Sequence, residues 1–251
     1  MCAQVRVALL EELAEKVERL DAANDLDAVG GLAPVLQALA SPHAEIQSAA
    51  AEVVANVVQN NPKSQDRAMD LGAMGKLLAM LDDGASDGAI RKRPERVLAM
   101  ALYAVGALVR GQLKAMDAFV LGNGPAACVG AMRGCGPRVQ RRALNFLAYV
   151  VTHHRKGGEA SAAAGGIRAG VACLMSRDDA VRHAALSYLL GLARVIDFEA
   201  NPGAVSDYRA PAVGLALGRI SGQAGSISTD EADARREEFS MAAELKRMLD
   251  G

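Results

Sequence analysis

The feature that most constrains the fold is an internal repeat. One family of segments opens with a glycine followed by an apolar run, and its members start at Gly30, Gly72, Gly122 and Gly165. A second family starts at Ala50, Ala101, Ala143 and Ala185. Both families share a period of about 42 residues with one longer interval, a length typical of armadillo or HEAT units with two or three helices each. Since one unit cannot bury its apolar face alone, we expect the units to stack into a solenoid.

The predicted fold is therefore all-α, an armadillo-like right-handed α-solenoid of about four repeats with N- and C-terminal capping helices. We expect a single domain over residues 1–251, with an N-terminal cap at 1–28 and a C-terminal capping helix at about 228–250. The predicted repeats cover residues 29–81, 82–134, 135–176 and 177–220. The longer interval comes from the turn-rich, charged segment 82–95, which reads as an exposed loop.

Both ends of the chain carry signals of atypical capping helices. Residues 9–20 read as an amphipathic helix, and Ser228 and Glu231 have the spacing of a capping box ahead of a final helix. Four apolar residues are expected to form the packing stripe of that final helix: Phe239, Leu245, Met248 and Leu249.

The composition excludes some classes of partner. Hydrophobic residues make up 51% of the chain, with 3% aromatic residues and no Trp, so the interior must consist mostly of Ala, Leu, Val and Met. The net charge of −1 gives no overall positive field for a nucleic acid or an anionic membrane. We therefore expect a protein partner and a monomeric chain.

The cysteines and the N-terminus indicate a cytosolic or nuclear protein without a metal. Cys2, Cys128, Cys135 and Cys173 lack zinc-ligand spacing and are expected to be small buried hydrophobes in a reducing compartment. The N-terminal apolar run is too short for a signal peptide, unless a leader has been removed. We expect no cofactor.

Aligning the second family of segments separates core positions from surface positions. Three aligned columns are apolar and spaced three and four residues apart, as a buried helix face requires. They are Ala51, Leu102, Leu144 and Leu186; Val54, Val105, Leu147 and Leu189; and Val58, Val109, Val151 and Ala193.

The remaining columns are mixed, and we assign them to inner helices that line a concave surface. They comprise Ala49, Met100, Arg142 and Ala184; Glu52, Tyr103, Asn145 and Ser187; Asn56, Ala107, Tyr149 and Gly191; and Gln59, Arg110, Thr152 and Arg194. Tyr, Arg and small residues together are typical of protein-binding surfaces. Composition alone leaves a second interpretation open, a solvated face that contacts nothing.

A helix stop follows the first aligned segment. Asn60 and Asn61 tolerate the left-handed conformation at a helix end, and Pro62 cannot continue the helix. This signal is sufficient to end one helix and separate two repeat units.

Two stretches carry a family resemblance. "AAAEVVANVVQNNPKSQDRAMDLGAMGKLLAML", from Ala49, and "ALYAVGALVRGQLKAMDAFVLGNG", from Ala101, resemble the armadillo-type nucleotide exchange factors of heat-shock protein 70, which include the Fes-type factors and heat-shock-protein-70-binding protein. The similarity runs from about Leu9 to the last helix, and "VQNNPKSQ" and "ALVRG" are its most specific parts.

The resemblance implies a co-chaperone that embraces the nucleotide-binding domain of heat-shock protein 70 with its concave face and promotes ADP release. It implies no catalytic side chain, so we expect no enzyme. It assigns Arg142 to a basic chaperone-binding position, Ala49, Ala50 and Ala51 to a small stretch facing the chaperone, Gln59, Asn60 and Asn61 to the "QNN" signature, and Arg110 to the basic residue of "ALVRG". Glu52, Asn56, Tyr103, Asn145 and Tyr149 join the chaperone-binding prediction only from the aligned columns.

Some sequence features depart from those of the family, and the sequence leaves alternative functions to consider. The longer interval and the Ala- and Gly-rich segment 159–166 predict local differences, and only a dozen residues precede the repeats where cytosolic relatives carry a client-releasing segment. An armadillo adaptor that binds an extended peptide in its groove is the alternative, but its usual Trp and Asn ladder is missing. The luminal relative would need a signal peptide, and an enzyme would need a catalytic motif; "GNGPAA" at residues 122–127 follows no predicted strand.

Overall fold

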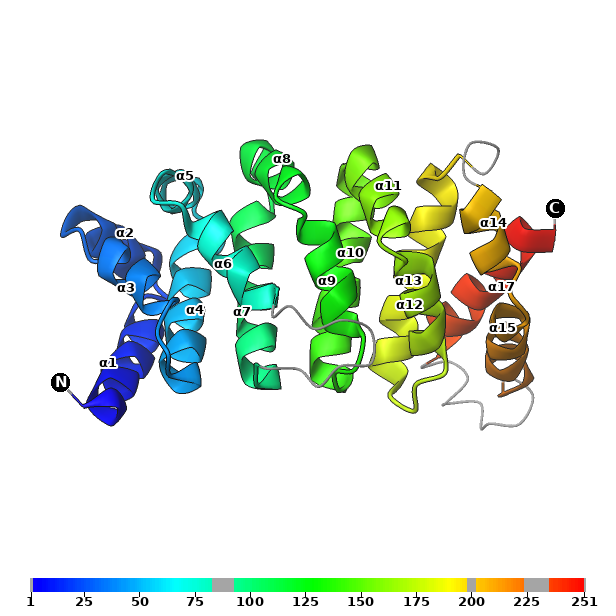
Figure 1. The fold of residues 1–251 in the computed structure, drawn as a ribbon, viewed down its shortest axis with the longest axis horizontal. Helices are drawn as coiled ribbons and strands as arrows, with labels where there is room; N and C mark the ends of the chain where they lie inside the picture. The colour runs from blue at the N-terminus through cyan, green and yellow to red at the C-terminus, as the bar shows by residue number, and fades with distance from the viewer. Residues whose placement is uncertain (1, 83–92, 198–201, 224–234, 251) are drawn as a thin grey trace. The chain divides into compact units, whose positions relative to one another are not determined.

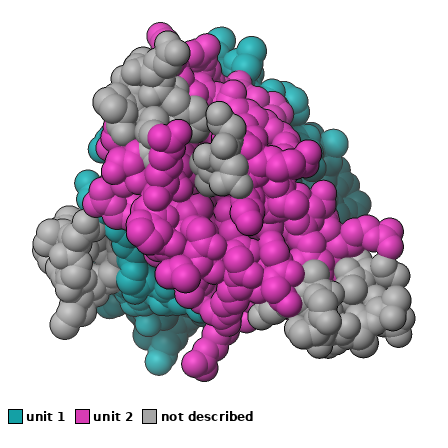
Figure 2. Space-filling view, turned by 90° about the vertical axis from the view of Figure 1, so that its right-hand side faces the viewer, with its two compact units in different colours: residues 1–142 teal, residues 143–251 magenta. Residues whose placement is uncertain are grey.

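A computed structural model describes residues 2–82, 93–197, 202–223 and 235–250 of the chain (Figure 1). The regular elements in these ranges are helices. Contacts divide the chain into two compact units, residues 1–142 and residues 143–251, which Figure 2 shows in two colours. The single domain with its repeat boundaries stays a prediction.

Unit 1 is built from groups of two short helices followed by a long one (Figure 1). The first helix, α1 (Ala3–Lys16), precedes these groups. The first group is α2 (Leu20–Ala28), α3 (Leu32–Ala38) and α4 (Ala44–Val58), and the second is α5 (Pro62–Asp70), α6 (Ala73–Leu81) and α7 (Glu95–Val109). The third is α8 (Leu113–Leu121), α9 (Gly124–Met132) and the start of α10 (Pro137–His153). The long helix α4 packs against α1 on one side and α7 on the other.

The apolar columns predicted from the alignment are confirmed. All twelve side chains are buried, none more than 5% exposed. The aligned alanines lie within the long helices α4, α7, α10 and α13 (Asp179–Val195). The periodic part of the sequence therefore identified the core.

A left-handed residue joins the first and second helix of each group. Gly30, Gly72 and Gly165 take φ angles of 72°, 75° and 80°, a region that costs residues with a Cβ atom free energy. The third joint differs from the repeat pattern, because Gly122 has φ −79° and the following Asn123 takes φ 62°. Asparagine is the residue other than glycine that tolerates this conformation best.

Unit 2 continues α10 and adds six described helices. They are α11 (Arg155–Ala163), α12 (Gly166–Leu174), α13, α14 (Pro202–Tyr208), α15 (Pro211–Gln223) and α17 (Arg236–Asp250). Helix α13 packs against α11, α12 and the C-terminal helix α17, and α15 packs against α12 and α17.

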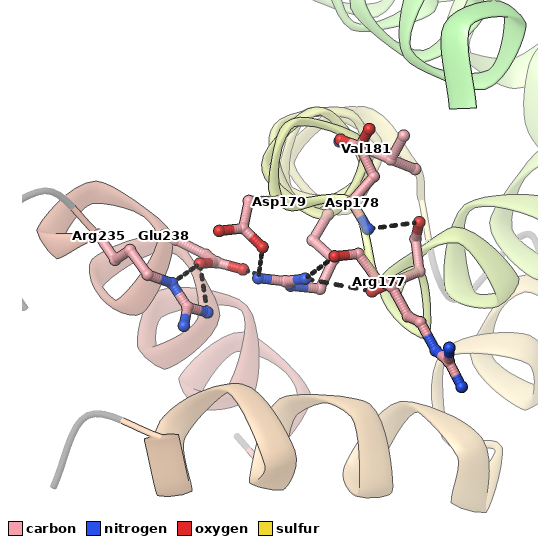
Figure 3. A network of polar contacts seen from close by, with 8 residues as sticks. Arg177, Asp178, Asp179, Val181, Arg235 and Glu238 are labelled. Atoms are coloured by element: carbon pink, nitrogen blue, oxygen red, sulfur yellow. Dashed lines mark hydrogen bonds and ion pairs between the residues drawn. The ribbon is translucent and has the colours of Figure 1, made fainter. Parts of the chain in front are cut away.

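A buried ionic network fastens α17 to α13 (Figure 3). Arg182 donates from Nε to Glu238 Oε1 at 2.8 Å and from Nη2 to Asp179 Oδ1 at 2.6 Å. The side chains of Arg182 and Glu238 are only 8% and 5% exposed, and Arg235 donates to the second oxygen of Glu238 at 2.7 Å. Burial lowers the pKa of Arg182, but its hydrogen bonds to Glu238 and Asp179 outweigh this and raise the pKa overall. The guanidinium therefore stays charged and depends on its carboxylate partners.

The terminal helices differ from their predicted limits. The predicted helix over residues 9–20 is wrong as a single element, because α1 ends at Lys16 and Leu20 begins α2. Ser228 and Glu231, the predicted capping box, lie outside the described residues.

The predicted stripe of α17 is confirmed in part. Leu245 is buried, Phe239 is half-buried, and Met248 is 37% exposed. The side chain of Leu249 lies outside the described residues. Sequence reasoning did not foresee Glu238 as the buried contact of this helix, because an isolated Glu usually marks a solvated face.

The left-handed joint gives a prediction with an internal control. Gly72→Ala should lower the free energy of unfolding by roughly 1–2 kcal/mol, because φ 75° is unfavourable for alanine. Gly75→Ala, in the first turn of α6, should raise it by up to about 0.5–1 kcal/mol through helix propensity. A Cβ atom at either position would meet no atom within 4 Å, so packing cannot explain a difference. Urea denaturation followed by circular dichroism measures both, and equal effects would contradict the conformational explanation.

The ionic network gives a second prediction. Glu238→Ala should cost about 3–5 kcal/mol of stability, because it leaves the Arg182 charge buried without its main partner. Glu237→Ala is the matched control, since that neighbouring side chain is 77% exposed and should change stability by less than about 0.5 kcal/mol. Thermal and urea unfolding of the two variants, compared with the wild type, tests the difference.

Candidate functional site

Side chains of α4 and α7 meet about one repeat apart in the sequence. The Tyr103 hydroxyl on α7 donates to Gln59 Oε1 at 2.9 Å and lies 3.4 Å from Asn56 Oδ1 on α4. Asn56 in turn donates from Nδ2 to the Ala14 carbonyl of α1 at 3.0 Å. The helices α1, α4 and α7 of unit 1 are thus linked through polar side chains.

Arg142, in the first half of α10, extends this surface. Its guanidinium carbon lies 5.2 Å from the centroid of the Tyr103 ring, within the range of a cation–π interaction. Its Nη1 donates to the Ala99 carbonyl of α7 at 2.5 Å. We call the set Glu52, Asn56, Gln59, Tyr103 and Arg142 the polar face of unit 1. Contacts join Asn56, Gln59, Tyr103 and Arg142, and the charge of Glu52 acts on Tyr103. That a partner binds these residues stays a prediction.

Burial raises the pKa of Tyr103, so its hydroxyl stays protonated. The carboxylates of Glu52 and Glu18 add to this shift of the pKa, and Arg142 opposes it. Burial lowers the pKa of Arg142, and the neighbouring Arg138 and Arg141 contribute. An arginine nevertheless remains charged at neutral pH. The polar face therefore presents a neutral hydroxyl group beside a fixed, half-buried cation.

The predicted helix stop also starts the next helix. Gln59 caps α4, Asn60 takes φ 54°, and Pro62 occupies the first position of α5. Asn61 Oδ1 accepts from the Ser64 amide at 3.3 Å, so Asn61 is the N-cap of α5, and it is only 4% exposed. Of the three residues in this signature, Gln59 and Asn60 are exposed and available to a partner, whereas Asn61 is structural.

Sequence reasoning missed Gln65, which closes the end of α7. Its Nε2 donates to the carbonyls of Ala107 and Arg110, both at 2.9 Å, and the side chain is 2% exposed. These carbonyls belong to the last turn of the helix, where no intrahelical donor remains. The sequence signal that could have identified Gln65 is a polar residue at a position that helical periodicity predicts to be buried. The exposed Arg110 thus projects from a helix end that Gln65 holds in place.

Two predicted contact residues are corrected by the structure. Ala49 and Ala50 are 0% exposed, because α4 is enclosed by α1 and α7 at these positions. Their side chains cannot reach a partner in this conformation. Small residues were interpreted as room for a partner to approach closely, but here they allow neighbouring helices to approach.

The two remaining predicted residues belong to unit 2. Asn145 is exposed on α10, and Tyr149 is half-buried. The Tyr149 ring stacks on His153, with centroids 4.1 Å apart and 27° between the planes. His153 Nδ1 lies 2.8 Å from the Tyr149 carbonyl, so that nitrogen carries the proton. His154 is the N-cap of α11 and accepts from the Gly157 amide.

The described ranges offer neither a metal site nor a membrane-spanning helix. No group of three or more His, Cys, Asp or Glu side chains there is arranged to hold a metal ion. None of the helices in these ranges combines the length and the apolar character needed to cross a bilayer.

Residues 22–145 match the sequence model of the SIL1/FES1/HPBP1 C-terminal domain. Through these residues the chain is similar to that family. The matched region runs from α2 into α10 and contains every residue of the polar face of unit 1.

Curated relatives agree with the family match. The chain is 31% identical over 114 residues to a protein named Hsp70 nucleotide exchange factor FES1 from Mycosarcoma maydis, a match that covers 45% of this chain and 27% of the relative. A FES1 protein of Yarrowia lipolytica is 34% identical over 117 residues, covering 47% of this chain and 39% of the relative. Human Hsp70-binding protein 1 is 27% identical over 213 residues, covering 84% of this chain and 56% of the relative. The chain thus spans about a quarter to just over half of these relatives.

Solved structures confirm the predicted fold class. An engineered protein superposes with a TM-score of 0.78 at 18% identity, over 100% of this chain and 94% of the other. A computationally designed armadillo repeat protein superposes with a TM-score of 0.75 at 17% identity, over 97% and 94% of the two chains. These likenesses show an armadillo-like α-solenoid fold.

The cysteines give a prediction about chemical reactivity. Cys128, Cys135 and Cys173 are buried, as expected, whereas Cys2 is exposed, which corrects that part of the prediction. Burial raises the pKa of Cys173 to about 11 and that of Cys128 further. Because the thiolate is the reactive form, a disulfide reagent at pH 8 should modify one thiol of the native protein rapidly and four after denaturation. Cys2→Ser should remove the fast phase, and a fast phase that persists would contradict the assignment.

Proposed function

We propose that this protein is a nucleotide exchange factor that binds the nucleotide-binding domain of Hsp70 and promotes ADP release. The observation that carries the proposal is the family match over residues 22–145, which includes the polar face. The names of the FES1 and Hsp70-binding relatives support the same partner. We propose that the polar face of unit 1, with Arg110 and Asn60 beside it, contacts the chaperone. For unit 2 we propose separately that Asn145 and Tyr149 contact the chaperone.

The arrangement of the polar face supports a binding role. Tyr and Arg are the residues that most often dominate binding energy at protein interfaces. Tyr103 and Arg142 hold each other in place through the cation–π contact and through hydrogen bonds to α4 and α7. A surface that is already ordered loses little side-chain entropy when a partner binds. The two residues are therefore pre-organised as anchors.

To promote nucleotide exchange, the protein must bind one conformation of the chaperone domain more tightly than another. The proposal needs no catalytic group. The factor accelerates ADP release if it binds the chaperone domain more tightly in a conformation that holds ADP weakly. By linkage, ADP must weaken the binding of the factor by the same ratio. We further propose that the protein acts as a monomer in the cytosol or nucleus.

The proposal is tested by release of a fluorescent ADP analogue from the Hsp70 nucleotide-binding domain in a stopped-flow instrument. The wild type should accelerate release in a concentration-dependent manner. Arg142→Ala should raise the concentration needed for half-maximal acceleration by about tenfold or more, as expected for an interface anchor. Arg155→Ala is the matched control, because Arg155 is exposed on α11 and pairs with Glu159 of the same helix.

Further variants separate binding from folding. Arg142 also donates to the Ala99 carbonyl, so the melting temperature of each variant must be measured alongside exchange. Tyr103→Phe keeps the ring beneath the guanidinium and removes the hydrogen bond to Gln59, so its effect should be smaller than that of Arg142→Ala. Wild-type protein that leaves ADP release unchanged at saturation would reject the proposal. Retained binding to an extended peptide would then favour the adaptor.

A further inference from the structure

The charged residues around the polar face are segregated by helix. Helical spacing continues this surface along each long helix at positions three or four residues apart, of which Ala49, Met100 and Ala107 are buried. On α4 the charged members are Glu45 and Glu52, whereas on α7 they are Arg96 and Arg110. On the unit 1 part of α10 they are Arg138 and Arg142. The surface is therefore acidic along α4 and basic along α7 and the start of α10.

Helix α1 extends the acidic side. Its Glu11 pairs with Arg96 of α7 at 3.4 Å, an ion pair between the two helices that pack on either side of α4. Both side chains are about half exposed, at 49% and 52%. An exposed pair of this kind contributes at most about 1 kcal/mol, so either charge can exchange its partner at low cost.

Tyr103 lies at the border between the two regions. The charges of Glu52 and Glu18 on one side and of Arg142 on the other all act on its hydroxyl. The net charge of the whole chain is only −1, so its overall field gives little steering. Any electrostatic selection of a partner must therefore come from this local separation of charge.

We propose that this surface orients its partner: it takes a folded protein surface with a basic patch opposite Glu45 and Glu52 and an acidic patch opposite Arg96 and Arg138. The inference rests on the proposed function and names the charge pattern that the chaperone domain must present to unit 1. Docking in the reverse direction would place like charges together, which is strongly unfavourable at an interface. Glu45 and Arg138 determine the direction of docking, and Tyr103 and Arg142 anchor its centre.

The test uses pairs of charge reversals that change the net charge equally. Glu45→Lys and its control Asp70→Lys each add two positive charges, and Arg138→Glu and its control Lys114→Glu each add two negative charges. Asp70 and Lys114 are exposed on α5 and α8, outside the polar face. Affinity for the Hsp70 nucleotide-binding domain is measured by calorimetry at low and at high salt.

We expect Glu45→Lys and Arg138→Glu each to weaken binding about tenfold at low salt, with a smaller loss at high salt because salt screens exposed charges. The controls should change the affinity less than about twofold, as expected for exposed charges away from an interface. Glu45 lies in the first turn of α4, where an acid favours the helix, so the neutral Glu45→Gln is measured too and should show an intermediate loss.

The outcomes separate this inference from the proposed function. Wild-type protein that binds the domain, with reversals that match their controls at both salt concentrations, would overturn the inference and leave the exchange-factor proposal standing. Wild-type protein that does not bind the domain would reject the proposed function and the inference together. A loss confined to Glu45→Lys and Arg138→Glu would establish the orientation.

Discussion

The close packing of α4 against α7 is the constraint on which the candidate site depends. The buried faces of these helices consist largely of alanine and valine, and the distance between packed helices is set by the side chains at their contact. Short side chains let the helices approach, and only then can Tyr103 reach Gln59 and Asn56 across the boundary between two repeats. The polar face is thus a product of the core beneath it, and a change in the core would displace it without altering any of its own residues.

The sequence predicted the parts of the structure that are periodic. Aligned columns identified the buried apolar face and brought Tyr103, Asn56 and Gln59 together, because residues one repeat apart occupy equivalent positions in stacked helices. Single contacts without a period were not predictable. Gln65 closes the end of a helix that begins only at Glu95, and nothing local to Gln65 indicates where that helix will end.

Alanine was the least predictable residue of the site. An alanine on an amphipathic helix satisfies a buried face and a small exposed face equally well, so Ala49 and Ala50 were assigned to the surface although they lie inside. Arg142 is half-buried, since a long side chain can leave the core while its stem packs against it. Glu238 shows the converse, since its burial depends on Arg182, which lies on another helix and far from it in the sequence.

The fastening of α17 by buried charges, described for unit 2, bears on how the chain can be shortened. A helix held only by apolar contacts loses stability gradually as it is shortened. Truncation before Glu238 instead removes a carboxylate partner of Arg182, whose side chain is almost fully buried. A chain truncated before Glu238 is thus expected to lose the folded structure of unit 2 and not merely some of its stability.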